Sequence, residues 1–219
     1  MLHDAETVPG AERWACINPS LEGCPCGGPR IAPGQGATIP DECLAASLTP
    51  YGYGALETAQ AYARVRGARA ITPVDLLIGI MLDGVALEAL LLPRYGLSIE
   101  EVKDCVSRAP SGRQAFLVWS ALDEEAADAL IQASHIAIEL GCGRVQAIHE
   151  VMALSTVAPI CDLFAAHGIT GARMQADSVE VLARVRALRA TKKAFVTLDE
   201  LSREIDDVVA GGERRQDAR

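Results

Sequence analysis

The sequence predicts an all-α protein in which a four-helix repeat occurs twice with pseudo-twofold symmetry, behind an irregular N-terminal arm. Apolar residues recur at helical spacing from residue 48 to residue 190, with only short breaks. Part of this region is repeated 74 positions later without a gap, which is the sequence sign of a duplicated unit. The first 46 residues lack such periodicity and contain six Pro and six Gly, a composition typical of loops.

These patterns divide the chain into five segments. They are an irregular arm rich in Cys, Gly and Pro (1–47), a first repeat (48–109), a linker (110–121), a second repeat (122–190) and a C-terminal helix with its tail (191–219).

Four helices are expected in the first repeat. The first runs from about residue 50 to residue 66 and ends at Gly67. The second begins at Thr72, a good N-cap, with Pro73 in the favoured first helical position. The third covers about residues 85–92, and the fourth opens with the capping box of Ser98 and Glu101 and runs to about residue 108.

The second repeat follows by alignment with the first. Residues 48–80 align with residues 122–154, so that Gly67 falls on Gly141. Further on, the segment from Tyr95 to Ser98 matches that from His167 to Thr170 after the loss of two residues. Four more helices are therefore expected, the last reaching about residue 189, and a ninth covers about residues 198–210. The residues from 211 onward are predicted to fray.

Composition excludes several classes of function. The chain has 219 residues, of which 50% are hydrophobic and 22% charged, so it is not globally disordered. Its net charge of -9 is opposite in sign to what a nucleic-acid binder requires. The acidic start is unlike a signal peptide, and the most apolar stretch is too short to span a bilayer. We therefore expect a cytoplasmic protein with neither a nucleic acid nor a membrane as partner.

A family resemblance is carried by residues 48–50, 70–80 and 95–102 in the first repeat, and by residues 144–154 and 167–170 in the second. In this order they resemble the Clp N-terminal domain, a pair of four-helix repeats that precedes the ATPase modules of Clp-type unfoldases. The resemblance covers about residues 48–185 and implies a compact α-bundle that docks adaptors, substrates or small-molecule ligands. The sequence contains no G-x-x-x-x-G-K-[ST] phosphate-binding loop. We therefore expect a stand-alone module and not an enzyme.

The sequence departs from the family at one ligand site. In the ClpC branch, the resemblance implies a phosphoarginine site with a Thr and a Glu in each repeat, the Glu being followed by His. The two Glu positions hold Val74 and Ile148 in this chain. Because Val and Ile cannot make bidentate, charge-assisted bonds, binding of phosphoarginine proteins is not expected.

The candidate partner-binding or ligand-binding groove consists of these family positions and the linker tryptophan. Its residues are Thr49, Val74, Asp75, Trp119, Asp123, Ile148 and His149. Two of these residues have a structural role as the alternative. Trp119 can pack between the two repeats. His149 can be a histidine at a helix start whose ring is hydrogen-bonded to the backbone.

The arm supplies four candidate metal ligands, Cys16, Cys24, Cys26 and Cys43. Thiolates suit zinc or another thiophilic metal, although this spacing is not that of paired C-x-x-C knuckles. A redox disulfide and free thiols are the alternatives, and no other cofactor is expected. The remaining cysteines are predicted to be small core residues at 105 and 161, and a turn residue, open to exposure, at 142.

Two functions from different classes follow. The first is a binding module for a protein or peptide, as an adaptor, decoy or ligand sink linked to a Clp-type protease system, with Clp components or clients as partners. The second is a metal-binding or redox protein that uses the cysteines of the arm on a helical scaffold. A further possibility is that the arm occupies the groove of the bundle as an internal pseudo-ligand.

Overall fold

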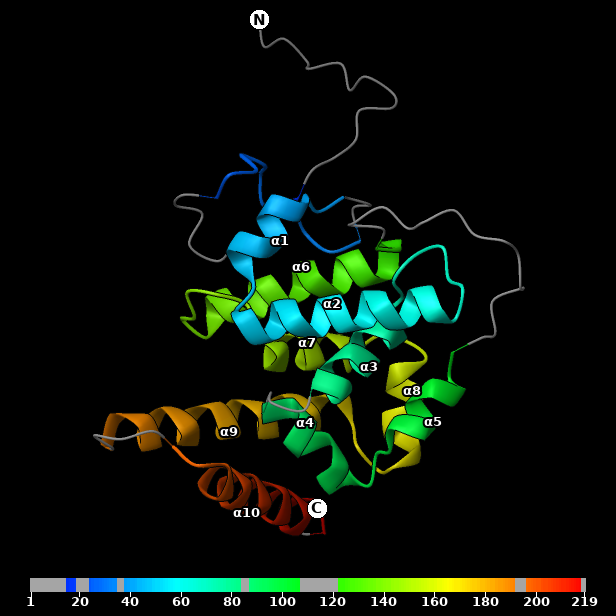
Figure 1. Cartoon of the computed structure of the whole chain (residues 1–219). Helices are drawn as coiled ribbons and strands as arrows, with labels where there is room; N and C mark the ends of the chain where they lie inside the picture. Colours follow the sequence, from blue (N-terminus) through cyan, green and yellow to red (C-terminus); the bar gives the residue numbers. More distant parts are fainter. Residues whose placement is uncertain are drawn as a thin grey trace, which may run out of the picture.

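The computed structural model describes residues 15–18, 24–34, 38–83, 87–106, 122–191 and 196–217. Within these ranges the chain is helical and forms no named strand (Figure 1). The helices, of which only η1 is a 3-10 helix, are α1 (Asp41–Ser47), α2 (Pro50–Val65), α3 (Pro73–Asp83), α4 (Leu87–Leu91), η1 (Leu92–Tyr95), α5 (Ile99–Asp104), α6 (Glu124–Glu139), α7 (Ala147–Leu154), α8 (Ile160–Ala166), α9 (Gly171–Thr191) and α10 (Leu198–Asp217).

Two short backbone bridges relate the repeats by a pseudo-twofold axis. Leu48 pairs with Val145, and Ile71 pairs with Leu122, both in the parallel sense. A shift of 74 positions turns Leu48 into Leu122 and Ile71 into Val145. Each bridge is therefore the image of the other with its partners exchanged, which is what a twofold axis between two copies produces.

The matching helices confirm the predicted duplication. Helices α2 and α6 both have 16 residues and begin 74 positions apart. Gly67 and Gly141 follow them with positive φ angles of 82° and 65°, a conformation that favours glycine after a helix end. Gly96 and Gly168 also match, with φ of 79° and 69°, and their offset of 72 positions agrees with the predicted loss of two residues before them.

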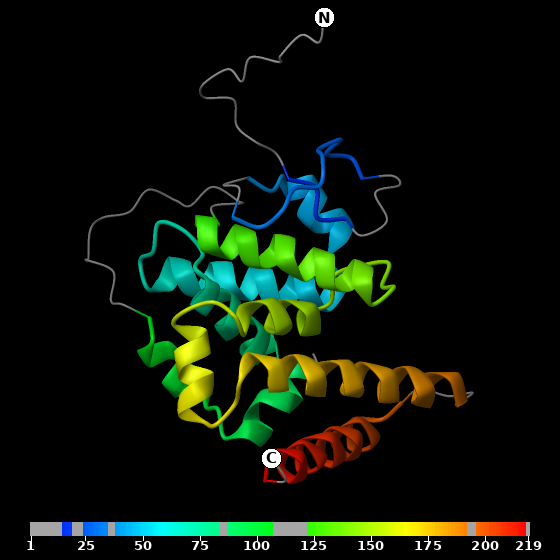
Figure 2. The same ribbon diagram turned by 180° about the vertical axis from the view of Figure 1, so that it is seen from behind.

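The core lies between layers of these helices. Helix α3 packs against α2, and α7 packs against α6. Figures 1 and 2, seen from opposite sides, show α9 and α10 at the far end of the molecule from α1. Small residues of α2 and α6, such as Ala59 and Ala133, are fully buried, and Ala59 lies where α2 closely approaches Gly79 of α3. Helix α3 is buried from Pro73 to Ile80. This agrees with the apolar character of its sequence on all sides.

Two regions differ from the sequence prediction. The arm contains a helix, α1, which buries Cys43, Leu44 and Ser47 along one face. A helix this short leaves little periodicity to detect. The predicted fraying after residue 210 is wrong, because α10 continues to Asp217. Helix α10 packs against α9 and α4, and Gly212 is buried. These tertiary contacts explain why the helix continues past residue 210.

None of the described helices combines the length and apolar character needed to cross a membrane.

Candidate metal centre and candidate partner-binding surface

The four cysteines of the arm converge on one point. The sulfur atoms of Cys16, Cys24, Cys26 and Cys43 all lie within 4.8 Å of one another. Neighbouring sulfurs are 3.1 Å apart for Cys24 and Cys26, 3.5 Å for Cys24 and Cys43, and 3.9 Å for Cys43 and Cys16. The sequence prediction that these four residues share a site therefore agrees with their positions, including the closely spaced Cys24 and Cys26.

This geometry suits a tetrahedral metal. With metal–sulfur bonds of about 2.3 Å, the sulfurs of a tetrahedral zinc site lie about 3.8 Å apart. The observed separations lie around this value. A disulfide would instead bring two sulfurs to about 2.05 Å. The structure has four mutually close thiols with no pair joined.

Backbone contacts hold the four ligands together although they come from separate parts of the arm. The N–H of Cys16 donates to the Pro29 carbonyl at 2.9 Å, which ties the first ligand segment to the residues after Cys26. The N–H of Ile17 donates to the Cys43 sulfur at 3.3 Å, and the Ser47 hydroxyl lies 3.6 Å from that sulfur. Such outer contacts orient metal-binding thiolates.

The four thiols of the cluster differ in their tendency to ionise. Burial raises the pKa of Cys16 to about 11 and raises the pKa of Cys43 as well. Burial also acts to raise the pKa of Cys24, but hydrogen bonds from the Cys26 backbone and from the neighbouring thiols lower it overall. A thiophilic cation would displace the protons of these thiols on binding.

The arm is attached to the bundle beside this cluster. The Nε2 of His135, on α6, lies 3.1 Å from the carbonyl oxygen of Ile31 in the arm. Because a carbonyl only accepts, the histidine ring donates in this contact. Helix α1 continues from the arm directly towards α2, as Figure 1 shows. The cluster therefore lies in a segment that contacts the second repeat and leads into the first.

Two candidate groove residues, Thr49 and Asp123, occupy equivalent places at the seam between the repeats. The N–H of Thr49 donates to the Val145 carbonyl at 2.8 Å, and the N–H of Asp123 donates to the Ile71 carbonyl at 3.0 Å. Their side chains cap α2 and α6 by accepting from backbone N–H groups. Both residues are half-buried. Their side chains thus act as helix caps, and each residue as a whole is partly open to solvent.

Four other candidate groove residues lie in the core: Val74, Asp75, Ile148 and His149. Asp75 accepts from the Arg66 guanidinium at 2.8 and 2.5 Å and from Thr72. His149 accepts the N–H of Gln146 at its Nδ1, at 3.0 Å, which agrees with the backbone-satisfied interpretation. These four side chains are buried, so they belong to the packing of the two repeats. Trp119 and the linker around it lie outside the described residues.

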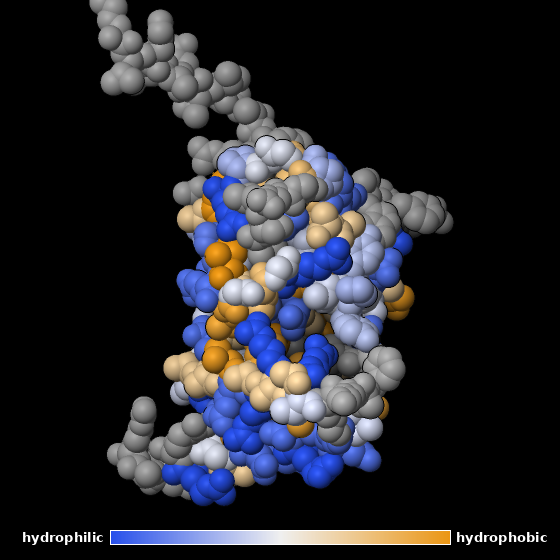
Figure 3. Space-filling model, turned by 90° about the vertical axis from the view of Figure 1, so that its left-hand side faces the viewer, coloured by the Kyte–Doolittle hydropathy of each residue, from blue (hydrophilic) through white to orange (hydrophobic). Residues whose placement is uncertain are grey.

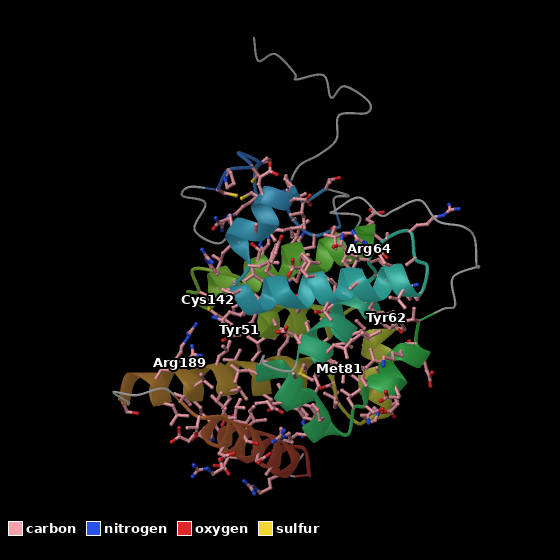
Figure 4. The ribbon with its side chains drawn as sticks, in the orientation of Figure 1. Tyr51, Tyr62, Arg64, Met81, Cys142 and Arg189 are labelled. Atoms are coloured by element: carbon pink, nitrogen blue, oxygen red, sulfur yellow. The ribbon has the colours of Figure 1, made fainter. Side chains whose placement is uncertain are left out.

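An exposed aromatic beside the seam was not singled out from the sequence. Tyr51, in the first turn of α2, exposes 56% of its surface. Figure 4 places Tyr51, Cys142 and Arg189 on the left-hand side of the molecule, at the start of α2, the α6–α7 loop and the end of α9. Figure 3 views this side and shows apolar residues along one edge and a hollow near the middle. We call Thr49, Tyr51 and Arg189 the seam face.

The predictions for the remaining cysteines require correction. Cys161 is exposed and Cys105 is half-buried, although both were expected in the core. Cys161 belongs to a short helix, α8, of which only Ile160 and Phe164 are buried. Cys142 is only 8% exposed, because its glycine-flanked turn folds back against α7 and α9.

Comparisons with known proteins identify the fold. No family model and no curated protein matches the chain. Similar solved structures include the Hsp104 N-terminal domain from Candida albicans (17% identity, TM-score 0.49, covering 67% of this chain and 93% of that one). A structure from preliminary investigations of a malarial protein secretion system has 16% identity and a TM-score of 0.51, and covers 66% of this chain and 97% of that one. The N-terminal domain of the Clp chaperone ClpD from Arabidopsis thaliana has 16% identity and a TM-score of 0.47, with coverage of 64% and 95%.

Two of the three structures named above are N-terminal domains of chaperones, Hsp104 and ClpD. At such low identities the likeness concerns the fold alone. The expected all-α class is confirmed.

Proposed function

We propose that this chain is a protein-binding module that acts as an adaptor, decoy or ligand sink in a Clp-type protease system of the cytoplasm. Its role is to hold a partner and not to transform a substrate. The observation that carries the proposal is the seam face, where the exposed ring of Tyr51 lies beside the half-exposed cap of Thr49. Tyrosine and arginine are the residue types that most often dominate the energy of protein interfaces.

The test is binding of the 219-residue chain to the purified Clp-type unfoldase from the same cells. Tyr51→Ala should weaken binding by about tenfold or more, since an interface aromatic commonly contributes over about 1.4 kcal/mol. Val65→Ala is the matched control, because Val65 is 87% exposed at the opposite end of the same helix. The absence of binding by the unaltered chain, or an equal effect of both substitutions, would contradict the proposal.

The second candidate function, metal binding, is supported by the convergence of the arm cysteines. We propose that Cys16, Cys24, Cys26 and Cys43 hold one Zn²⁺. The metal form of the cysteine hypothesis is favoured over the disulfide form because the four sulfurs surround a common point and do not form separate pairs. Four protein ligands close a zinc site, so the metal would be structural and would hold the arm on the bundle.

Elemental analysis of the anaerobically purified 219-residue chain tests the zinc proposal. One zinc per chain is expected, and Cys43→Ser should lose it because a buried ligand is removed. Cys161→Ser, at an exposed cysteine outside the cluster, should retain it. Protein that lacks stoichiometric metal, or that keeps its zinc after Cys43→Ser, would overturn the proposal.

A further inference from the structure

The side of the molecule that carries the seam face also carries three exposed arginines. Arg144 lies in the loop between α6 and α7, and Arg186 and Arg189 lie near the end of α9. Figure 4 shows Arg189 on the same side as Tyr51. We call Arg144, Arg186 and Arg189 the arginine group.

Hydrogen bonds connect the segments that carry these residues. The N–H of Thr49 donates to the Val145 carbonyl at 2.8 Å, which places the start of α2 beside Arg144. Both terminal nitrogens of Arg186 lie 3.4 Å from the Leu140 carbonyl, at the end of α6. The start of α2, the α6–α7 loop and the last turns of α9 therefore adjoin one another.

The arginine group differs from the arginines that hold the fold together. Within the described part of the chain, no carboxylate lies within ion-pair distance of any of its three members. By contrast, Arg184 pairs with Glu180 and with Glu204 of α10. At about 100° per residue, Arg186 lies about 200° around α9 from Arg184, and Arg189 lies within about 60° of Arg186. Helix α9 thus presents its paired arginine to α10 and its unpaired arginines to the seam face.

The local charge of this surface is opposite in sign to that of the whole chain. Residues 48–53, 139–145 and 186–191 contain three arginines and one carboxylate, Glu139, whereas the net charge of the chain is -9. A second carboxylate, that of Glu150, lies next to Gly52 below the surface, and this residue is only 1% exposed. The helix dipole accounts for a cation such as Arg189 in the last turn of α9, but not for Arg144 in a loop. The surface therefore has a positive charge that no ion pair of the described residues neutralises.

We propose that the seam face receives an acidic segment of a protein partner, whose carboxylates pair with the arginine group while an apolar part packs on the ring of Tyr51. This inference rests on the proposed binding role and names the chemical class of the partner. Guanidinium groups bind carboxylates through two parallel N–H···O bonds, which suits them to this task. A long polyanion such as a nucleic acid fits less well, because the net charge of the chain repels it.

Fluorescence anisotropy with the 219-residue chain tests the inference. The probe is a short fluorescein-labelled peptide with a central leucine between runs of glutamate, and the comparison peptide has serine in place of each glutamate. The acidic peptide should bind at least about tenfold more tightly, because the serine peptide forms no ion pairs. Its affinity should fall when ionic strength rises from about 0.1 M to about 1 M, since the Debye length shortens from about 10 Å to about 3 Å. Equal binding of the two peptides, or binding that salt does not weaken, would overturn the inference.

Substitutions locate the binding site. Arg144→Gln and Arg189→Gln should each weaken binding of the acidic peptide by about threefold, and the double variant by about tenfold. Arg69→Gln is the matched control, because Arg69 is an exposed arginine beyond the opposite end of α2 and its loss changes the net charge equally. This variant should bind as the unaltered chain does. Equal losses in Arg69→Gln and Arg189→Gln would show that net charge alone matters and would refute the site.

Two further outcomes separate this inference from its alternatives. A fluorescein-labelled single-stranded oligonucleotide that bound as tightly as the acidic peptide, and lost affinity in the same variants, would show that the assignment to an acidic protein is wrong. Binding of the Clp-type unfoldase that depends on Tyr51, without binding of the acidic peptide, would overturn this inference and leave the proposed function intact. Binding of the acidic peptide without any Clp component would support this inference and contradict the proposed function.

Discussion

Equivalent positions in the two repeats keep a polar side chain in the core by different means. Asp75 is paired with a guanidinium and with the start of its own helix. His149 is a neutral ring with a partner at each nitrogen, the Gln146 N–H and the Cys142 sulfur. Both residues are fully buried. A buried polar group costs stability unless it is hydrogen-bonded, and each repeat meets this condition with its own residues.

Stability should fall in acid because of His149. Its pKa in the folded protein is lowered to about 4, chiefly by burial, whereas an unfolded chain protonates this residue near pH 6.5. The unfolded state therefore binds the proton first as pH decreases. The contribution of His149 is fully present above pH 6.5 and is lost as the pH falls towards 4. The loss amounts to about 3 kcal/mol in the free energy of unfolding.

Urea denaturation at pH 7.5 and pH 4.5 measures this effect. The difference in unfolding free energy between the two pH values should shrink in His149→Asn relative to the unaltered chain. His135→Asn is the control, since His135 is half-buried and contacts the arm instead of the core. An equal pH dependence in His149→Asn and the unaltered chain would show that this histidine titrates normally.

Among the helices of the first repeat, α2 and α3 cross at very short range around Gly79. A Cβ atom on Gly79 would lie 2.2 Å from the carbonyl oxygen of Ala55 and 2.8 Å from the Cβ of Ala59. No side chain fits there without separating the two helices. The second repeat has Ala153 at the corresponding position, so the crossing of α6 and α7 leaves room for a methyl group.

Gly79→Ala should accordingly destabilise the protein, by about 1–3 kcal/mol, because overpacking against backbone cannot be relieved by a side-chain rotation. Gly211→Ala offers a matched substitution within a helix. No atom lies within 4 Å of a Cβ built on Gly211, so alanine should stabilise α10 by about 0.5–1 kcal/mol. Thermal melts of the two variants should shift in opposite directions. A shift of the same sign in both would contradict the packing account.

The helices of the repeats could be predicted because their signals are local. Pro73 with Thr72 marks a helix start, and Gly67 and Gly141 mark helix ends that the structure confirms. Other features depend on contacts that no local pattern contains. Helix α1 and the last turns of α10 form through docking, and the exposure of Tyr51 depends on what lies beside it.

The candidate sites were likewise only partly predictable from the sequence. The cysteines of the arm could be grouped by residue type, yet only the fold shows that sequence positions 16 and 43 meet. The groove positions were chosen by family alignment, which does not show that the side chains of Val74 and Ile148 are buried. Arg186 had no motif around it, and its contact with Cys142 joins residues 44 positions apart.

In the whole molecule, two joined repeats form a frame to which the arm is attached. The two bridges at the pseudo-twofold axis fix the repeats to each other, and the arm leads from the cysteine cluster into the start of α2. The seam face lies where these parts adjoin, since Thr49 and Tyr51 immediately follow the first bridge at Leu48. A partner bound there would contact both the frame and the residues that connect it to the arm.

Site-specific crosslinking in living cells tests the proposed binding role most directly. A photoreactive phenylalanine derivative is placed at position 51, or at position 65 as the control on the same helix. The account predicts a crosslink from position 51, and not from position 65, to the Clp-type unfoldase, its adaptor or a client of its protease. If neither position captures a Clp component, or both do so equally, the seam face is not the binding surface and the account is wrong.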